Sequence, residues 1–416
     1  MATKTKSRPP AARSAPRRSV LSRRAIAIEE SITLALTDKV NQLKAKGVDV
    51  VSFGAGEPDF DTPLHIKQAA VDAIAKGATK YTSSSGILAL RKAVAAKLQK
   101  ENGLAYDPQT QVIITAGGKQ AIFNVIQAML NEGDECLIAS PFWVSYPEMV
   151  KTAGAKPVIV RTREAEGFKL SPRALEKAIT KKTKLFIHCS PSNPTGIVYS
   201  EAEQRAIAEV FVERGVHVLS DEVYEKLIYG GVKHFSIAQC SPEAKELTIV
   251  VNSFSKSYAM TGWRMGYAAG PAAIIGGCAK IQSQSTSNPN SVTQVACISA
   301  LEGDQSAIEM MRGEYEKRRD FIVQRLNAIP GISCIKPEGA FYAFPRVDKL
   351  FGKKHSGRTV TDANALADLL LELSRVLVVP GPGFGADEYI RLSYATSMKT
   401  IQDGLDRIEK FVKELQ

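Results

Sequence analysis

KLFIHCSPSNPTG (184–196) is the first of three segments that decide the fold, and VHVLSDEVY (216–224) and LTIVVNSFSK (247–256) follow it. Each segment begins with a short apolar run of strand length and ends in a polar turn. Strands that are apolar throughout, with helical stretches between them, indicate a mostly parallel sheet covered by helices on both faces. We therefore expect an α/β fold with a central sheet sandwiched by helices.

The same alternation extends outward from these segments. We expect further strands at VDVVSF (48–53), QVIIT (111–115), ECLIA (135–139), PVIVR (157–161) and residues 265–269, and near the C-terminus at 334–345, 375–381 and 389–395. Helical spacing predicts helices at 26–43, 64–76, 87–100, 119–130, 146–153, 305–328 and 399–415. The expected organisation is a basic tail (1–25), an N-terminal segment of a small domain (26–60), a large domain (61–305) and a C-terminal α+β small domain (306–416).

The composition is that of a globular chain, with 44% hydrophobic and 23% charged residues, which excludes collagen-like, disulfide-scaffold and wholly disordered classes. Its net charge of +11 is concentrated in residues 1–25, which hold eight basic side chains and no acid. This Pro- and Arg-rich tail is expected to be disordered. A solvated tail and an organelle transit peptide both fit it, and so does a nucleic-acid binder attached to an inactive body.

The cysteines and the apolar runs indicate the cellular compartment in which the protein is expected. All six cysteines are scattered singly, without a C-x-x-C pair and away from the five histidines, which favours a reducing, cytoplasmic setting and argues against a Cys-based metal site. An organellar location is the alternative if the tail is a transit peptide. The longest apolar stretch, 265–279, is broken by glycines and is shorter than the ~20 residues of a membrane-spanning helix.

Ligands of open parallel sheets bind beyond the carboxyl ends of the strands, so the residues at these ends are the candidates for chemistry. Lys256 follows two serines at the end of its strand. Partial desolvation and the nearby cation Arg264 would lower the pKa of this amine and make it available for imine formation with an aldehyde. An ordinary surface lysine is the alternative for this residue taken alone.

Asp221 follows an apolar strand, so we expect it to be buried and to need a cationic partner or a proton. A protonated heteroaromatic nitrogen would be such a partner, and Tyr224 and Asn193 could bind a phenolate oxygen. Taken singly, Asp221 also fits a helix N-cap and Asn193 an Asn-Pro turn. Gly117 and Gly118 precede an expected helix, where backbone N–H groups can cradle a phosphate.

Together, these motifs closely resemble those of the fold-type I pyridoxal-phosphate aminotransferases. The resemblance is greatest to the bacterial and plastid type of aspartate aminotransferase in class I, subgroup Ib, and covers roughly residues 26–416. The motifs that carry it are GAGEPDF (54–60), GGKQA (117–121), SPFWVSYPEM (140–149), SPSNPTG (190–196), SDEVY (220–224), SFSK (253–256) and RLSYA (391–395).

The resemblance implies that Lys256 binds pyridoxal 5′-phosphate through its amine and then moves a proton, and that Asp221 keeps the ring nitrogen protonated. Tyr224 and Asn193 would bind the ring hydroxyl, and Trp143 would stack on the ring face. The implied phosphate ligands are Ser253, Ser255, Arg264, the amides of Gly118 and Lys119, and Tyr81 from a neighbouring subunit. This last residue implies a homodimer with shared active sites.

The resemblance also implies a dicarboxylate substrate, bordered by Trp143 and Asn193. Arg391 would form two parallel hydrogen bonds with the α-carboxylate. Gly56 would allow the backbone to approach the same carboxylate closely. Lys119 would bind the distal carboxylate of aspartate or glutamate, under a segment that carries Ser31 and Thr33. The implied reaction is ping-pong transfer of the amino group between L-aspartate and 2-oxoglutarate, with no metal, nucleic acid or membrane involved.

Two alternatives stay open within the family. Some subgroup members also convert prephenate to arogenate, and Thr33 together with Lys119 matches the pattern associated with that activity. Those members tend to carry a basic residue where this chain has Glu29, whose charge would repel the additional carboxylate. A different amino-acid specificity is the second alternative.

Overall fold

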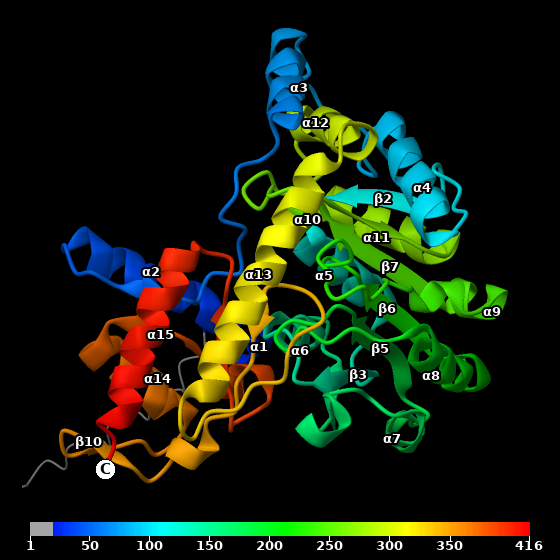
Figure 1. Cartoon of the computed structure of the whole chain (residues 1–416). Coiled ribbons are helices and arrows are strands. Elements are labelled where there is room, and N and C mark those ends of the chain that lie inside the picture. Colours follow the sequence, from blue (N-terminus) through cyan, green and yellow to red (C-terminus); the bar gives the residue numbers. More distant parts are fainter. Residues whose placement is uncertain (1–19) are drawn as a thin grey trace, which may run out of the picture.

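The computed structural model describes residues 20–416, and Figure 1 shows its arrangement. Most of the expected basic tail, residues 1–19, lies outside the described residues. The remainder of that tail leads into α1 (Arg23–Ala27), which is capped by the Ser22 side chain. None of the helices in residues 20–416 is both long and apolar enough to cross a membrane.

A seven-stranded sheet forms the centre of the molecule, in the order β2-β8-β7-β6-β5-β3-β4. All neighbouring strands pair in parallel except β8, which is antiparallel to both β2 and β7. The expected mostly parallel sheet is thereby confirmed. The strands are β2 (Val112–Thr115), β3 (Glu135–Ser140), β4 (Lys156–Arg161), β5 (Thr183–Cys189), β6 (His217–Asp221), β7 (Thr248–Ser253) and β8 (Gly266–Ala269).

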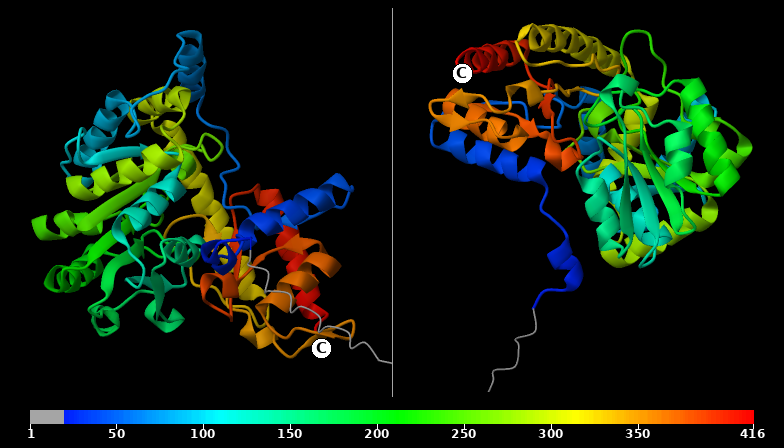
Figure 2. Two further views of the ribbon diagram at one scale, coloured as in Figure 1. Left: turned by 180° about the vertical axis from the view of Figure 1, so that it is seen from behind. Right: turned by 90° about the horizontal axis from the view of Figure 1, so that it is seen from below.

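Helices cover both faces of this sheet (Figure 2). One apolar cluster joins Ile122 and Val125 to the strand residue Leu219, and another on a different side joins Phe186 to Phe211. Burial of these side chains is the main favourable term that holds helices and sheet together. The helices are α3 (Leu64–Ala75), α4 (Leu88–Asn102), α5 (Gly118–Met129), α6 (Ser145–Thr152), α7 (Pro172–Ala178), α8 (Glu201–Arg214), α9 (Pro242–Leu247), α10 (Phe254–Ser257), α11 (Ala272–Ser285) and α12 (Ser291–Glu302).

The N-terminal and C-terminal segments come together beside the sheet. β1 (Val51–Ser52) pairs in parallel with β12 (Val376–Leu377), and Phe53 packs in the same core as Leu405. Figure 1 shows α13 (Ser306–Ala328) running from the central sheet to these C-terminal elements. The other elements here are α2 (Ile32–Ala45), β9 (Tyr342–Ala343), β10 (Lys354–His355), β11 (Arg358–Thr359), α14 (Ala363–Ser374), β13 (Val379–Pro380), β14 (Ile390–Ser393) and α15 (Met398–Lys413).

The structure departs from expectation in several elements of the N-terminal and C-terminal segments. The strand expected at 48–53 is reduced to Val51–Ser52, and the one expected at 375–381 is divided into β12 and β13. The helix expected over 26–43 is split into α1 and α2, because residues 28–31 leave the helical path and the Glu29 N–H donates to Glu148 Oε2 at 2.9 Å. The strand expected within 334–345 is reduced to Tyr342–Ala343. Its first part instead follows the loop that passes Gly196, to which the amides of Glu338 and Gly339 donate.

Candidate active site

The polar turns that follow the strands lie at one edge of the central sheet. Asp221 is the last residue of β6, and Lys256 lies in α10 directly after β7. Asn193 follows β5, and Gly118 begins α5 shortly after β2. Since β2 runs in the same direction as the parallel strands, all four positions meet at the carboxyl edge where ligands of such sheets bind.

Lys256 is largely enclosed by protein, and its ammonium donates to the backbone oxygen of Gly56. The pKa of this amine is lowered to about 8, mainly by burial; the positive charges of Arg264 and Arg391 add to this lowering, and Glu57 opposes it. A substantial share of the amine is therefore neutral near pH 8. The structure favours a reactive lysine over a solvated loop lysine.

Asp221 is buried, as expected, with 6% of its surface exposed. Tyr146 Oη donates to its Oδ2 at 2.5 Å, and the Val223 N–H donates to its Oδ1 at 3.3 Å. Burial raises the pKa of the carboxyl to about 6, although the Tyr146 hydrogen bond and Lys256 both act to lower it. Within residues 20–416 no cation is hydrogen-bonded to this carboxylate, so it can still pair with a positively charged ligand atom.

Arg391 is fully enclosed rather than exposed on a strand surface, with 2% of its area accessible. Its guanidinium donates to Asn193 Oδ1 at 3.0 Å and to the Gly54 oxygen at 2.8 Å, and it lies 4.5 Å from the Tyr342 ring centre. Its Nε has no hydrogen-bond partner. Because a buried guanidinium without a counter-ion is costly, this arrangement suits an incoming carboxylate.

Tyr224 lies close to the same group. Its hydroxyl is 2.7 Å from the hydroxyl of Tyr342, and both phenols are buried. Phe341 stands edge-on to Tyr224 and also lies 5.9 Å below the Lys256 ammonium. The expected grouping of Tyr224, Lys256 and Arg391 is thus present, with Tyr342 at its centre.

An anion cradle surrounds the start of α5. Gly117 has φ +89°, and a Cβ there would lie 2.5 Å from the Arg264 guanidinium, so a side chain could not be added without moving this arginine. Ser253 caps α10 by accepting from the Ser255 N–H at 3.3 Å. The free backbone N–H groups of α5, the two hydroxyls and the guanidinium form a donor set suited to a phosphate.

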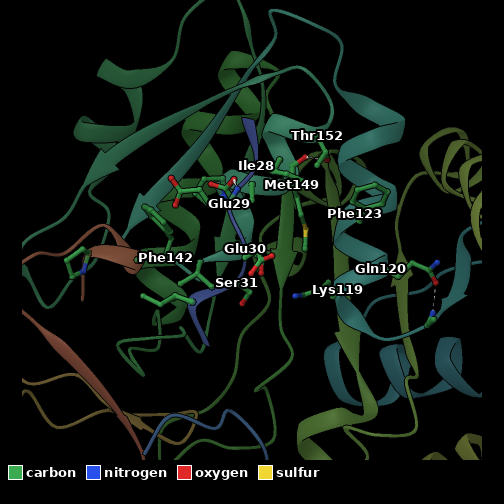
Figure 3. A pocket seen from close by; sticks show the side chains of 18 of the residues that line it. Ile28, Glu29, Glu30, Ser31, Lys119, Gln120, Phe123, Phe142, Met149 and Thr152 are labelled. Atoms are coloured by element: carbon green, nitrogen blue, oxygen red, sulfur yellow. Dashed lines mark hydrogen bonds between the residues drawn. The ribbon is translucent and has the colours of Figure 1, made fainter. Parts of the chain in front are cut away.

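Lys119 borders a cavity of about 870 Å³. Its ammonium lies 5.0 Å from the Trp143 ring centre, and burial together with Arg264 lowers its pKa. Figure 3 shows Glu29 and Ser31, from the segment between α1 and α2, at the same cavity. Apolar walls are provided by Phe123, Phe142, Val144 and Met149.

Two expected residues are not part of this group. Tyr81 is 92% exposed and makes no contact with Lys256 or Asp221 in a single chain. Thr33 lies on α2, where its hydroxyl is 2.9 Å from that of Ser31 rather than at the cavity wall.

Sequence reasoning missed several residues of the site. Tyr342 contacts both Tyr224 and Arg391, and Glu57 acts electrostatically on Lys256. Tyr146 stands three residues after Trp143 and touches both this ring and Asp221. That spacing within SPFWVSYPEM, which puts the two aromatic side chains on one side of a helical turn, is the signal that could have identified Tyr146.

A separate buried charge cluster lies behind β6. Glu222 accepts from the hydroxyls of Ser220 and Ser236 and is 2.9 Å from His234 Nε2. Glu225 accepts from the Lys97 ammonium, which carries the charge that a metal ion would otherwise supply. We interpret this cluster as an internal ion-pair network.

The residues at the sheet edge fit a phosphorylated aromatic aldehyde with a basic ring nitrogen. Asp221 is a buried carboxylate without a bonded cation, and Lys256 is an amine with a lowered pKa. The cradle at Gly117 and Arg264 would receive the phosphate. Pyridoxal 5′-phosphate has all three of these features.

Comparisons with known proteins agree with this geometry. Residues 48–408 match the family described as aminotransferase class I and II. The chain is 48% identical to an aspartate aminotransferase of Geobacillus stearothermophilus over 94% of its length and 99% of the relative, and 46% identical to an aspartate/prephenate aminotransferase of Nitrosomonas europaea over 93% and 98%.

Solved structures resemble the chain over almost its full length. The aspartate aminotransferase of Rhizobium meliloti has a TM-score of 0.92 at 42% identity, covering 95% of this chain and 99% of that one. The aspartate aminotransferase of Thermus thermophilus with maleate has a TM-score of 0.89 at 44% identity, covering 94% and 99%.

Proposed function

The chain belongs to the class I and II aminotransferases, and we propose that it transfers the amino group between L-aspartate and 2-oxoglutarate with pyridoxal 5′-phosphate as cofactor. The observation that carries this proposal is the presence of two cationic side chains, Arg391 and Lys119, at the candidate site. Arg391 acts electrostatically on the Lys256 amine, and the Lys119 ammonium lies 5.0 Å from the Trp143 ring centre. Two cations suit a substrate with two carboxylates.

The cofactor is held by the chain's own residues. Lys256 provides the attachment point, Asp221 pairs with the ring nitrogen, Tyr224 and Asn193 bind the ring hydroxyl, and Trp143 covers the ring face. The phosphate is held by Ser253, Ser255, Arg264 and the amides of Gly118 and Lys119. When bound, the cofactor supplies an aldehyde for the amino group and a ring that delocalises the electrons released at the substrate's Cα.

Lys256 also moves the proton. Its lowered pKa means that the Lys256 Nζ can accept the proton released at the substrate's Cα, hold it as an ammonium and give it up again without a large energetic penalty. Phe341 and the Gly56 oxygen partly enclose the amine, and the reduced solvation strengthens the repulsion from the surrounding cations that favours its neutral form.

Arg391 orients the substrate through its α-carboxylate. The guanidinium is already fixed by Asn193 and the Gly54 oxygen, so little side-chain entropy is lost when the carboxylate binds. Lys119 would then receive the distal carboxylate. The aspartate-named relatives, and the solved Thermus enzyme with the dicarboxylate maleate, support this assignment.

A homodimer with shared active sites is part of the proposal. Tyr81 is an aromatic side chain left 92% exposed in one chain, as expected for a residue that reaches the phosphate bound by a partner. Exposed Leu64, Val71 and Ile74 on α3 provide additional apolar surface for such an association.

Dual use of prephenate is the second candidate function. The cavity beside Lys119 has about 870 Å³ and apolar walls, which is more room than a four- or five-carbon dicarboxylate needs, and the Nitrosomonas relative carries the double name. Glu29 at this cavity opposes a further carboxylate. 2-Oxoglutarate therefore stays the preferred amino acceptor over prephenate in our proposal.

A coupled assay tests the proposal. Purified protein with pyridoxal 5′-phosphate, L-aspartate and 2-oxoglutarate is expected to form oxaloacetate and glutamate in equal amounts, and Lys256→Ala is expected to form neither. Rates measured with a panel of other amino donors at equal concentration show how aspartate ranks among them. Turnover in the Lys256→Ala protein, or a donor preference without aspartate or glutamate, would reject the assignment.

A further inference from the structure

Tyr146 is a buried phenol that the reaction described above leaves without a role. It lies on α6, and 2% of its surface is exposed. Its hydroxyl donates to Asp221 Oδ2 at 2.5 Å. The only other hydrogen bond to this carboxylate in the described residues is the longer one, of 3.3 Å, from the Val223 N–H. Tyr146 is therefore the main fixed contact of the Asp221 side chain.

The position of the phenol is itself fixed from two sides. Its ring packs edge-on against Trp143, with 5.3 Å between ring centres and 85° between ring planes. The Cys189 thiol, on the strand next to β6, contacts the same hydroxyl. A hydroxyl held in this way can orient one carboxylate oxygen and leave the other available.

This hydrogen bond has an electrostatic consequence. Burial favours the neutral form of Asp221 and raises its pKa to about 6, whereas donation from Tyr146 lowers it. A hydrogen bond to a carboxylate stabilises the charged form more than the neutral form. Without the donor, a larger fraction of Asp221 would be protonated near neutral pH, and the neutral acid has no charge with which to attract a protonated ring nitrogen.

We propose that Tyr146 is a positioning residue that keeps Asp221 ionised and aimed at the ring nitrogen of the cofactor. The proposal rests on the proposed function, since it takes the cofactor to be pyridoxal 5′-phosphate. Tyr146 acts entirely through Asp221 and does not touch the reacting atoms. Trp143 and Tyr146 of SPFWVSYPEM thus have different roles: Trp143 covers the ring, and Tyr146 supports the group that binds the ring nitrogen.

Cofactor binding to the apo-protein is the test. The dissociation constant of pyridoxal 5′-phosphate is measured by absorbance titration across a pH series for wild type and Tyr146→Phe, which removes only the hydroxyl. We expect binding to weaken about ten- to hundredfold near neutral pH, as for the loss of a hydrogen bond to a charged group. The acid limb of the binding profile is expected to move to higher pH, because Asp221 is then protonated more readily.

Tyr199→Phe is the matched control. Tyr199 is also buried, and its hydroxyl accepts from the Leu170 N–H at 2.7 Å instead of contacting Asp221. Its substitution is expected to leave both the affinity and the acid limb unchanged. Equal losses in the two variants would show that removing any buried hydroxyl has this effect, and would overturn the proposal.

Measurements in the Asp221→Asn background distinguish an effect of Tyr146 that acts through Asp221 from a general effect on the site. The asparagine cannot ionise, so adding Tyr146→Phe to it is expected to leave both the cofactor affinity and the pH profile of the single variant unchanged. A further loss in the double variant, or an unchanged profile for Tyr146→Phe alone, would refute the proposal while leaving the function intact. Failure of wild type to bind the cofactor would instead reject the proposed function and this inference with it.

Discussion

The ammonium of Lys119 lies 5.0 Å from the centre of the Trp143 ring, at the wall of the large cavity. This contact holds a cation next to the face where the cofactor ring is proposed to stack. It gives the site a positive charge in addition to Arg391, and we propose it as the basis of a dicarboxylate preference.

Lys119→Met is expected to lower kcat/KM for aspartate about ten- to hundredfold, the loss of one charge-assisted hydrogen bond. The rate with alanine, which has no distal carboxylate, is expected to change much less. Steady-state kinetics with the two donors measure this difference. An equal loss for both donors would place Lys119 in cofactor binding alone.

Arg391→Lys provides the opposite pattern. A lysine keeps the charge but cannot form two parallel hydrogen bonds with one carboxylate, and it loses the contacts to Asn193 and the Gly54 oxygen. We expect kcat/KM to fall for aspartate and alanine alike, since both carry the α-carboxylate. A loss confined to aspartate would mean that Arg391 binds the distal carboxylate instead.

Glu29→Lys tests the prephenate alternative. Glu29 lines the cavity, so reversing its charge is expected to raise the ratio of prephenate to oxaloacetate turnover about twofold to fivefold, the range for exposed charge pairs. Glu29→Gln should give a smaller rise in the same direction. An unchanged ratio in both variants would remove Glu29 as a determinant of acceptor choice.

His234 gives a prediction on stability. Burial acts to lower the pKa of this imidazole, but Glu222 outweighs burial and raises it. A raised folded-state pKa contributes stability that is complete below the unfolded value of about 6.5 and is lost as pH rises through the folded value. Thermal unfolding at a series of pH values should show this loss in wild type and a weaker one in His234→Gln. Identical slopes in the two proteins would mean that folding does not change the pKa of His234.

The fold followed from sequence where burial alone decides structure. β5, β6 and β7 lie within a residue or two of the segments expected from their apolar runs, because such runs are stable only inside a covered sheet. The split between α1 and α2 was not predictable in this way. It depends on the Glu29 N–H binding Glu148, a contact across 119 residues that no local pattern contains.

The candidate site shows the same difference between features that local sequence predicts and features that depend on distant contacts. Lys256, Asp221 and Asn193 were predictable as candidates because each lies at the end of an apolar strand or within a few residues after it. Tyr342 could not, since only the pairing of β9 with β14 brings it to Arg391. Position in the chain predicts which residues reach the sheet edge, whereas their partners depend on packing between distant segments.

The account depends on Lys256 as the attachment point of the cofactor, and chemical reduction tests this most directly. Holoenzyme treated with borohydride, digested and analysed by mass spectrometry is expected to carry the reduced pyridoxal 5′-phosphate on the peptide that contains Lys256, and on no other. Label at a different lysine, or no label on this peptide in protein that binds the cofactor, would contradict the central claim.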